Sequence, residues 1–321
     1  MTTLSERARG MLLGLATGDA LGTTNEFCPR QSAQELTTII GGGPFALEAG
    51  KWTDDTSMAL CLADALLAQG RYDSTEVMRR YAAWHNEGYR SSTGHCFDIG
   101  IQISHALETF HHDPSALVAQ NSPRSTNAGN GCIMRLAPVI IAGFPRRDPR
   151  DIIKMARISA RETHYSEEAE AATEVFAALL TNAMNGHPKD EILNIGWAST
   201  GTAFDDCARK AISTDPHLRA ASQENTSGYV IHGLALAVWG LMDFSSFTDA
   251  ALAIANLGGD ADTNAAIFGQ LGGAFYGVEG IPRQWRSLIY EGGAIQDLAD
   301  HLLNMTISEQ ATTRFEEDFY L

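Results

Sequence analysis

This 321-residue chain has no long hydrophobic run and no surplus of basic residues. No uninterrupted apolar stretch approaches the roughly 18 residues that a membrane-spanning helix requires. Gly14, Gly18 and Asp19 interrupt the apolar segment near the N-terminus, so we expect neither a signal peptide nor a membrane span. Lys and Arg number 23 against 39 Asp and Glu, and the resulting net charge of −16 argues against nucleic-acid or acidic-membrane partners, which need a basic surface.

The chain also lacks any regular cysteine spacing. Its five cysteines form no CxxC pair, which argues against a zinc knuckle or a disulfide framework: Cys28, Cys61, Cys96, Cys132 and Cys207. An odd number of scattered cysteines in a chain of this length fits a reducing compartment. We therefore expect a cytoplasmic protein. We also expect it to be a monomer.

Segments that alternate between polar and apolar residues, as exposed strands do, are hard to find. Nearly every periodic segment has helical spacing instead, which predicts an all-α protein. We see neither a composition break that would separate two domains nor a repeat of fixed period, so we expect one helical domain over residues 1–305 and a loosely attached tail over 306–321. The predicted helices include Glu6–Leu21, a helix capped by Asp73 and ending near Glu87, Pro149–Arg161, Ser166–Met184, Pro188–Ala198, Thr202–Ile212 and Phe247–Asn256.

Two predicted helices begin with carboxylates and hydroxyls but continue as apolar, small-sided segments. Trp52–Thr56 contributes Thr53, Asp54 and Asp55, and Gly258–Asn264 contributes Asp260, Asp262 and Thr263. Each start alone is compatible with ordinary N-capping. If the two starts face each other, however, they offer six side-chain oxygens of the kind that Mg²⁺, Mn²⁺ and Ca²⁺ prefer, so together they favour a binuclear metal site.

Several other polar residues have an ordinary interpretation and a functional one. Glu26 lies in the long loop Thr23–Lys51, where a solvated acid is the usual outcome, and Asp98 precedes a helix that it could cap. Asn127–Gly131 forms either a plain turn or a cradle for phosphate or sugar oxygens. His164 could hold a ligand or close a turn, and Tyr229 could line a pocket or be a half-buried core residue.

Arg135 lies four residues after Gly131, the last residue of the glycine-containing segment. Its partner could be a phosphate or an internal Asp, and an internal Asp is the more frequent of the two.

With these residues in view, the chain resembles the ADP-ribosylglycohydrolase family from about Arg7 to Trp285. The resemblance is carried by motifs in family order: Gly18–Gly22, Trp52–Thr56, Phe97–Gly100, Gly129–Gly131 with Met134 and Arg135, Thr163–His164, Ser227–Val230 and Gly258–Thr263. It implies an all-α, single-domain orthogonal helical bundle that cleaves the glycosidic bond between ADP-ribose and a modified acceptor.

The resemblance also implies roles for individual residues. Two divalent cations, Mg²⁺ or Mn²⁺, would be held by Thr53, Asp54, Asp55, Asp260, Asp262 and Thr263. Glu26 and Asp98 would be the catalytic acids, Glu26 on a mobile loop over the metals. The ADP-ribose would contact Asn127, Gly129, Asn130, Gly131, His164 and Tyr229.

The acceptor and the class of activity are less constrained by these motifs. We expect ADP-ribosyl-arginine on a protein, with ADP-ribose as the product, because Phe97–Gly100 and Gly258–Thr263 both match the bacterial type. Serine-linked or nucleic-acid ADP-ribose is an alternative acceptor. A catalytically silent ADP-ribose-binding relative and a binuclear phosphoester hydrolase are alternatives from other classes.

Overall fold

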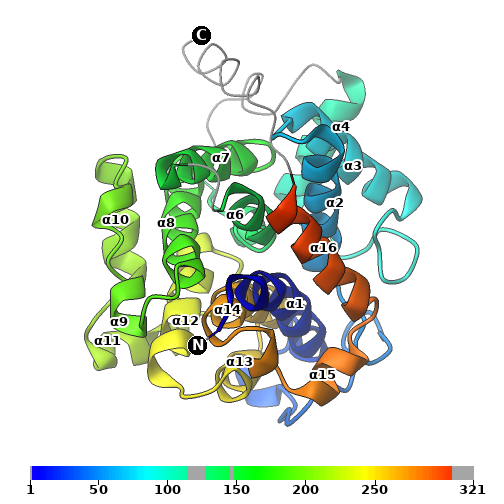
Figure 1. The fold of residues 1–321 in the computed structure, drawn as a ribbon. Coiled ribbons are helices and arrows are strands. Elements are labelled where there is room, and N and C mark those ends of the chain that lie inside the picture. The colour runs from blue at the N-terminus through cyan, green and yellow to red at the C-terminus, as the bar shows by residue number, and fades with distance from the viewer. Residues whose placement is uncertain (1, 114–126, 145–147, 306–321) are drawn as a thin grey trace.

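The N-terminal helix α1 (Leu4–Gly22) packs unusually closely against α14 (Ala261–Tyr276). Its glycines recur at every fourth residue and so share one face: Gly10, Gly14, Gly18 and Gly22. A Cβ atom added to Gly18 would lie 2.1 Å from the carbonyl oxygen of Ala265, and one added to Gly14 would lie 2.2 Å from that of Gly269. The two helices therefore meet backbone to backbone at the centre of the molecule (Figure 1).

The computed structural model describes residues 2–113, 127–144 and 148–305. Besides α1 and α14, its α-helices are α2 (Asp54–Gln69), α3 (Ser74–Glu87), α4 (Ile101–His112), α6 (Ala137–Gly143), α7 (Pro149–Arg161), α8 (Glu167–Met184), α9 (Lys189–Ile192), α10 (Thr202–Ala211), α11 (Pro216–Ala221), α12 (Val230–Asp243), α13 (Phe247–Ala255), α15 (Arg283–Leu288) and α16 (Gly292–Asn304). Six short 3₁₀ turns, η1 to η6, connect some of them.

The remaining helices surround the central pair. In Figure 1, α2, α3, α4 and α16 lie on one side of α1 and α14, and α8, α10 and α12 lie on the other. Within the described ranges, the only β-type pairings are two isolated bridges, Gly42 with Leu47 and Gly129 with Tyr229. The all-α prediction is thus confirmed. None of the described helices combines the length and apolar character needed to cross a lipid bilayer.

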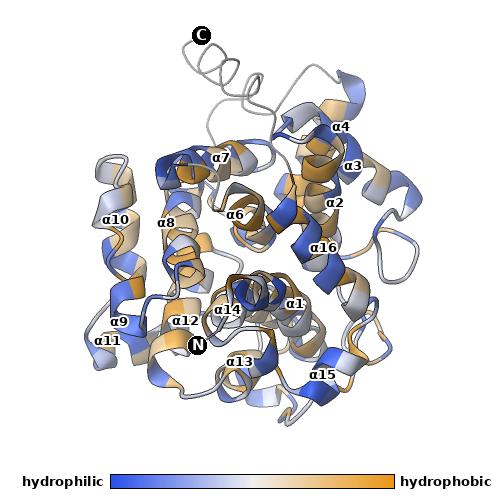
Figure 2. Cartoon of the chain, in the orientation of Figure 1, coloured by the Kyte–Doolittle hydropathy of each residue, from blue (hydrophilic) through white to orange (hydrophobic). Residues whose placement is uncertain are grey.

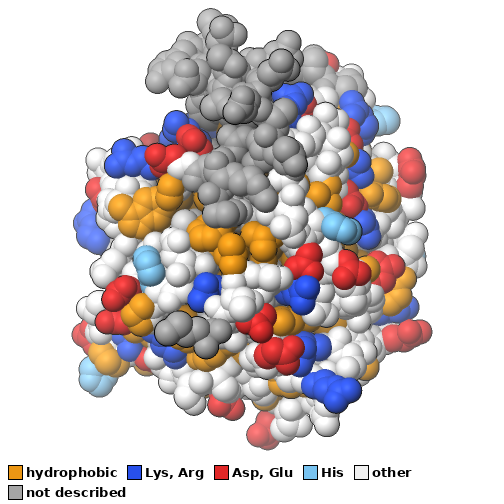
Figure 3. All heavy atoms as spheres, viewed as in Figure 1, with side chains coloured by type: hydrophobic (Ala, Val, Ile, Leu, Met, Phe, Trp, Pro, Cys, Tyr) orange, Lys and Arg blue, Asp and Glu red, His pale blue; other side chains and the backbone are white. Residues whose placement is uncertain are grey.

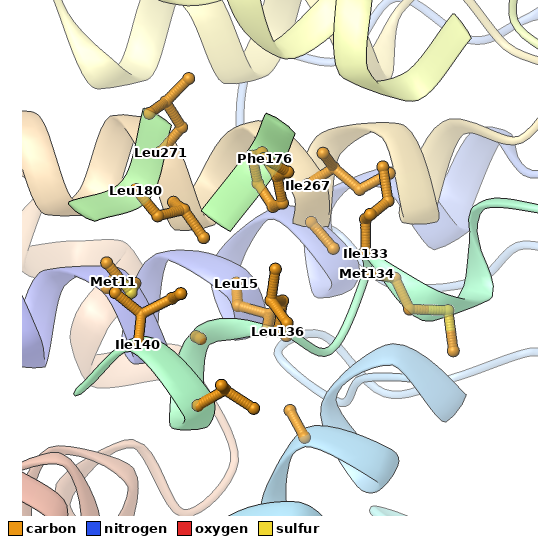
Figure 4. Close-up of a cluster of buried hydrophobic side chains, with 14 of the residues drawn as sticks. Met11, Leu15, Ile133, Met134, Leu136, Ile140, Phe176, Leu180, Ile267 and Leu271 are labelled. Carbon is orange, nitrogen blue, oxygen red and sulfur yellow. The ribbon is translucent and has the colours of Figure 1, made fainter. Parts of the chain in front are cut away.

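The core is built where four helices meet. Figure 4 shows Met11 and Leu15 of α1, Ile140 of α6, Leu180 of α8 and Leu271 of α14 pointing toward one another, and all five are fully buried. The outer helices α7, α10 and α16 carry hydrophilic residues on their outer sides (Figure 2). On the face drawn in Figure 3, acidic and basic side chains are intermixed and form no continuous basic patch. The starts of α2 and α14 therefore rest on a tightly packed support.

Most predicted helix boundaries agree with the structure, and the exceptions have local causes. Pro149–Arg161 is confirmed at both ends as α7, and Asp73 caps α3 by accepting from the Glu76 N–H. The predicted helix over Pro188–Ala198 is wrong, because the segment divides into α9 and the 3₁₀ turn Gly196–Ala198. Residues 306–321 lie outside the described residues, so the predicted tail and the domain boundary stay predictions.

Candidate active site

The starts of α2 and α14 converge, as the sequence predicts. Thr53 is the N-cap of α2 and Asp260 is the N-cap of α14. The Thr53 Oγ1 atom lies 3.4 Å from Asp262 Oδ2 and 3.2 Å from Asp55 Oδ2. Of the six predicted ligands, five are buried and Asp260 is partly exposed: Thr53, Asp54, Asp55, Asp260, Asp262 and Thr263. The structure thus gathers residues from both ends of the chain into one acidic cluster.

N-capping does not account for these side chains. Neither Thr53 nor Asp260 makes a side-chain capping hydrogen bond. The N-terminus of α2 is instead satisfied by the fully buried Asp19 of α1, which accepts from the backbone N–H groups of Thr53 and Thr56 at 2.8 and 3.0 Å. Asp19 also accepts from the hydroxyls of the same two threonines at 3.0 and 2.6 Å. The carboxylates at the starts of α2 and α14 therefore remain available for another partner.

Asp19 was not among the predicted site residues. The sequence does contain a signal for it, because a carboxylate between Gly18 and Ala20 in an otherwise apolar helix has to find buried donors. Burial raises the pKa of Asp19 to about 6, against the lowering effect of its threonine donors.

The part of the chain that the structure describes supplies no cationic side chain to balance the acidic cluster. Among the described residues, no lysine or arginine forms an ion pair with any of its carboxylates, and three of its buried oxygens have no hydrogen-bond partner: Glu26 Oε2, Asp55 Oδ1 and Asp262 Oδ1. Burial and then mutual repulsion raise the pKa of Asp54, Asp55 and Asp262 well above the ordinary value. Unpaired carboxylate oxygens converging in a buried site have the chemistry of a ligand set for a hard divalent cation, so these residues fit one.

Glu26 and Asp98 join the cluster from two other segments. One carboxylate oxygen each of Glu26, Asp98 and Asp262 lies within 4.8 Å of the others. The loop behind Glu26 is fixed to the start of α14, because the Phe27 N–H donates to the Gly259 carbonyl at 2.7 Å and the Gly259 N–H donates to the Cys28 carbonyl at 2.8 Å. Glu26 is therefore buried, and its interpretation as a solvated loop acid is wrong.

Asp98 does not cap the helix that follows it. Gly100 is the N-cap of α4, and Asp98 has a left-handed backbone conformation with φ of 59°, which is uncommon for a residue other than glycine. Burial raises the pKa of Asp98 to about 7. Burial, followed by repulsion from Asp262 and Asp98, raises the pKa of Glu26 to about 12. Without a cation, these neighbouring carboxyls retain protons that free acids would have lost.

The segment Asn127–Gly131 borders the acidic cluster. Asn130 donates from Nδ2 to Asp260 Oδ2 at 2.5 Å, and its backbone N–H donates to the Gly228 carbonyl at 2.9 Å. Gln102, which the sequence analysis missed, accepts from the Gly129 N–H at 3.1 Å. The backbone N–H groups of Gly129 and Asn130 are therefore already bonded within the protein.

His164 lies beside these glycines. A Cβ atom built on Gly129 or on Gly131 would stand 3.1 Å from His164 Nε2, so any larger residue at either position would meet the imidazole. The backbone of His164 closes the turn after α7 by donating to the Ala160 carbonyl at 2.7 Å, while its side chain faces the glycines. Burial and the nearby Arg135 guanidinium lower the pKa of His164 to about 3, so the imidazole is neutral.

Two further predicted contacts border this segment. Tyr229 is half-buried, pairs its backbone with Gly129 and packs its ring edge-on against His232 with centroids 4.9 Å apart. The exposed Asn127 accepts at its carbonyl from Gln102 Nε2 at 3.2 Å.

Arg135 is fully buried, and among the described residues it forms no ion pair with an Asp, so the internal Asp partner is a wrong prediction. It donates to the Gly131 carbonyl and to the Thr163 hydroxyl.

Comparison with known proteins gives consistent matches over nearly the whole chain. A family model described as ADP-ribosylglycohydrolase matches residues 1–312. The ADP-ribosylarginine hydrolase Tri1 of Pseudomonas putida (strain GB-1) is 40% identical over 301 residues, which cover 93% of this chain and 78% of that protein. The ADP-ribosylarginine hydrolase Tri1 of Serratia proteamaculans (strain 568) is 35% identical over 306 residues, covering 95% and 81%.

A more distant relative and a solved structure agree with these matches. The ADP-ribosyl-dinitrogen reductase glycohydrolase of Rhodospirillum rubrum is 28% identical over 291 residues, covering 89% of this chain and 90% of its own. A solved structure described as an ADP-ribosylglycohydrolase-related protein complex superposes with a TM-score of 0.79 at 35% identity, covering 94% of this chain and 99% of the other.

Proposed function

The chain belongs to the ADP-ribosylglycohydrolase family, and from this membership we propose that it releases ADP-ribose from modified arginine side chains of proteins. The family makes it a hydrolase of ADP-ribosyl glycosidic linkages. Two relatives at 40% and 35% identity carry the name ADP-ribosylarginine hydrolase, which supports arginine over serine or nucleic acid as the acceptor. The reaction adds water across the C1″–N bond and so reverses mono-ADP-ribosylation.

One structural observation carries the proposal. Buried, uncompensated carboxylates converge beside Glu26 and Asp98, and Asn130 links that cluster directly to the glycine segment next to His164. These contacts support a site for hard cations beside the residues that would bind the nucleotide sugar.

Two divalent cations, Mg²⁺ or Mn²⁺, would be held by Thr53, Asp54, Asp55, Asp260, Asp262 and Thr263. When bound, such ions supply charge stabilisation and polarise coordinated oxygens. They would also reverse the local sign of a site that, in a chain of net charge −16, would otherwise repel the pyrophosphate. The unpartnered Asp55 Oδ1 and Asp262 Oδ1 atoms support this ligand set.

Glu26 and Asp98 handle the protons. Their carboxyl groups are adjacent, with oxygens within 4.8 Å. One carboxylate accepts a proton from the attacking water as the new C1″–O bond forms, and a proton returns to the guanidinium nitrogen as the C1″–N bond breaks. The loop that carries Glu26 is hydrogen-bonded to Gly259, and this attachment would hold the Glu26 carboxyl over the cluster.

The ADP-ribose would lie along Asn127, Gly129, Asn130, Gly131, His164 and Tyr229. The absence of side chains at Gly129 and Gly131 lets the imidazole lie directly against this segment. Tyr229 offers a half-buried ring at the edge of this space.

The working form of the protein is also part of the proposal. One chain supplies every residue of the site, which supports a monomer acting on an ADP-ribosylated protein. The five free cysteines support a reducing compartment, which we take to be the cytoplasm.

The direct test is product analysis on peptides ADP-ribosylated at arginine or at serine, with and without EDTA. Metal-dependent release of free ADP-ribose from the arginine peptide is the expected result. Release from the serine peptide alone would overturn the choice of acceptor. Tight ADP-ribose binding without turnover would indicate a non-catalytic relative, and release of phosphate or AMP would indicate a phosphoester hydrolase.

A further inference from the structure

The Thr163 hydroxyl lies between two nitrogen-bearing side chains. It is 2.7 Å from Nη2 of Arg135 and 2.8 Å from Nδ1 of His164. Among the described residues it has no third hydrogen-bond partner. Thr163 and His164 are both buried, so water does not supply an easy alternative.

In its hydrogen bond with Thr163, Arg135 can be only the donor. Its guanidinium also donates to the Gly131 carbonyl at 2.7 Å and to the Ser159 carbonyl at 3.4 Å. The ring of Tyr81 covers one face of it, with 4.9 Å between the guanidinium carbon and the ring centroid. An arginine has five N–H donors and no acceptor. The Thr163 oxygen therefore accepts from Arg135.

The hydrogen of the Thr163 hydroxyl then has one available acceptor, which is His164 Nδ1. A neutral imidazole carries a hydrogen on one nitrogen and a lone pair on the other. If Nδ1 accepts from Thr163, the hydrogen must be on Nε2. The buried, neutral state of His164 excludes the form with both nitrogens protonated.

The Nε2 atom is the one that faces the glycine segment. It lies 3.1 Å from the position that a Cβ atom would take on Gly129, and the same distance from that on Gly131. Within the described part of the chain, it has no hydrogen-bond partner of its own. A donor at Nε2 is thus directed at the segment that carries two residues without side chains.

We propose that Arg135 and Thr163 are positioning residues that fix His164 as an Nε2–H donor to a pyrophosphate oxygen of the bound ADP-ribose. The inference rests on the proposed function for the identity of the ligand. At neutral pH, pyrophosphate oxygens accept hydrogen bonds and donate none, so they are attracted to the Nε2–H form. The opposite form would present a lone pair to the same oxygens and repel them. Arg135 acts through Thr163 and contributes no contact with the ligand.

The first experiment measures the imidazole directly in the ligand-free protein. Long-range ¹H–¹⁵N NMR correlations distinguish the two neutral forms of histidine, and the His164 signals are assigned among the ten histidines by their loss in His164→Gln. We expect the Nε2–H form in the wild-type protein. Finding the Nδ1–H form there would overturn the proposal, whether or not any variant folds.

Two variants test the role of Thr163. Thr163→Val removes the hydroxyl and keeps the shape, whereas Thr163→Ser keeps the hydroxyl. We expect Val to convert a large part of His164 to the Nδ1–H form and Ser to leave it as in the wild type. An unchanged imidazole in a folded Thr163→Val protein, judged by circular dichroism, would contradict the relay.

Binding completes the test. Because one directed hydrogen bond becomes a repulsion, ADP-ribose affinity should fall about 3- to 10-fold in Thr163→Val and return in Thr163→Ser. If affinity is equal in both variants while the imidazole changes as expected, His164 does not donate to the ligand and the proposal fails. If the wild-type protein does not bind ADP-ribose at all, the proposed function fails instead, which the NMR result on the free protein distinguishes.

Discussion

The Thr53 Oγ1 atom lies 3.4 Å from Asp262 Oδ2, although the two residues are 209 positions apart in the chain. This contact joins the starts of α2 and α14, two helices that bring their carboxylates into the same buried volume. Carboxylates that share a buried volume repel one another strongly in a site of low polarity. Their proximity, with no cationic partner among residues 2–113, 127–144 and 148–305, is the physical basis of the predictions for the metal site.

Asp262→Asn should abolish turnover and weaken Mg²⁺ or Mn²⁺ binding at least about 100-fold, because it removes a carboxylate ligand at almost constant volume. In EDTA the same variant should be more stable than the wild type by about 1–2 kcal/mol, since one buried unpaired acid is gone. Calorimetric titration with the cation and urea unfolding in EDTA measure the two effects.

Asp297→Asn is the matched control for this variant, because Asp297 is exposed on α16. It should leave both metal affinity and stability as they are. Equal metal affinity in wild type and Asp262→Asn would remove Asp262 from the ligand set.

Asp19→Asn should reduce the free energy of unfolding by about 2–3 kcal/mol, since the new amide N–H₂ group would face donors that the carboxylate now accepts from. Asp19 accepts four hydrogen bonds from Thr53 and Thr56. Cation affinity should fall as well, because Thr53 is no longer held. Asp300→Asn, at a partly exposed ion pair with Arg9, is the comparison and should cost about 0–1 kcal/mol. Similar losses for the two variants in urea unfolding would contradict the role of Asp19.

The site residues at helix starts could be predicted from the sequence, but few of the residues that support them could. Thr53, Asp54 and Asp262 were predictable because polar residues before an apolar, small-sided segment are visible in one dimension. Asp19 and Gln102 were missed because their partners, Thr56 and the Gly129 N–H, come from distant segments. The partners of Arg135 were predicted wrongly for the same reason. A buried guanidinium needs internal acceptors, but only the packing shows that two backbone carbonyls and Thr163 supply them, and that Nε has none among the described residues.

Gly18→Ala should destabilise the protein by about 2–3 kcal/mol through overpacking, because its Cβ atom would lie 2.1 Å from the Ala265 carbonyl oxygen of α14. Separating α1 from α14 also moves Asp262 away from Thr53, so cation affinity should fall together with stability. Thermal unfolding and metal titration measure both effects. The matched control is Gly196→Ala, where nothing lies within 4 Å of the added atom. Equal melting temperatures for the two variants would show that the close contact between α1 and α14 has no energetic importance.

The metal-free protein should lose stability as the pH rises from about 5 to 8. The pKa of Asp98 is raised to about 7 and that of Glu26 to about 12, so the folded state holds protons that the unfolded chain releases. Stability from this source is fully present below the ordinary carboxyl pKa, near 4, and is lost as the pH rises through the folded value.

Melting temperatures measured in EDTA across this pH range test the expectation. Added Mg²⁺ or Mn²⁺ should reduce the decline, because a bound cation replaces the protons, whereas NaCl at matched ionic strength should have little effect. If the melting temperature declines equally with and without the divalent cation, the acidic cluster does not bind it.

His164 should make the protein sensitive to acid in a different range. Burial, with a smaller contribution from Arg135, lowers the pKa of His164 to about 3 from an ordinary value of 6.5. The unfolded chain therefore takes up a proton below about pH 6.5 that the folded imidazole does not accept. This contribution to stability is present above that pH and is lost as the pH falls toward 3, with a slope of about 1.4 kcal/mol per pH unit.

His164→Gln removes the titrating group, so its unfolding free energy in urea should decline less steeply than that of the wild type between pH 6.5 and 4.5. His105→Gln, at an exposed position on α4, should keep the wild-type slope. Parallel slopes for wild type and His164→Gln would mean that the imidazole accepts a proton in the folded state, and it would then not be the neutral donor that the Thr163 hydrogen bond requires.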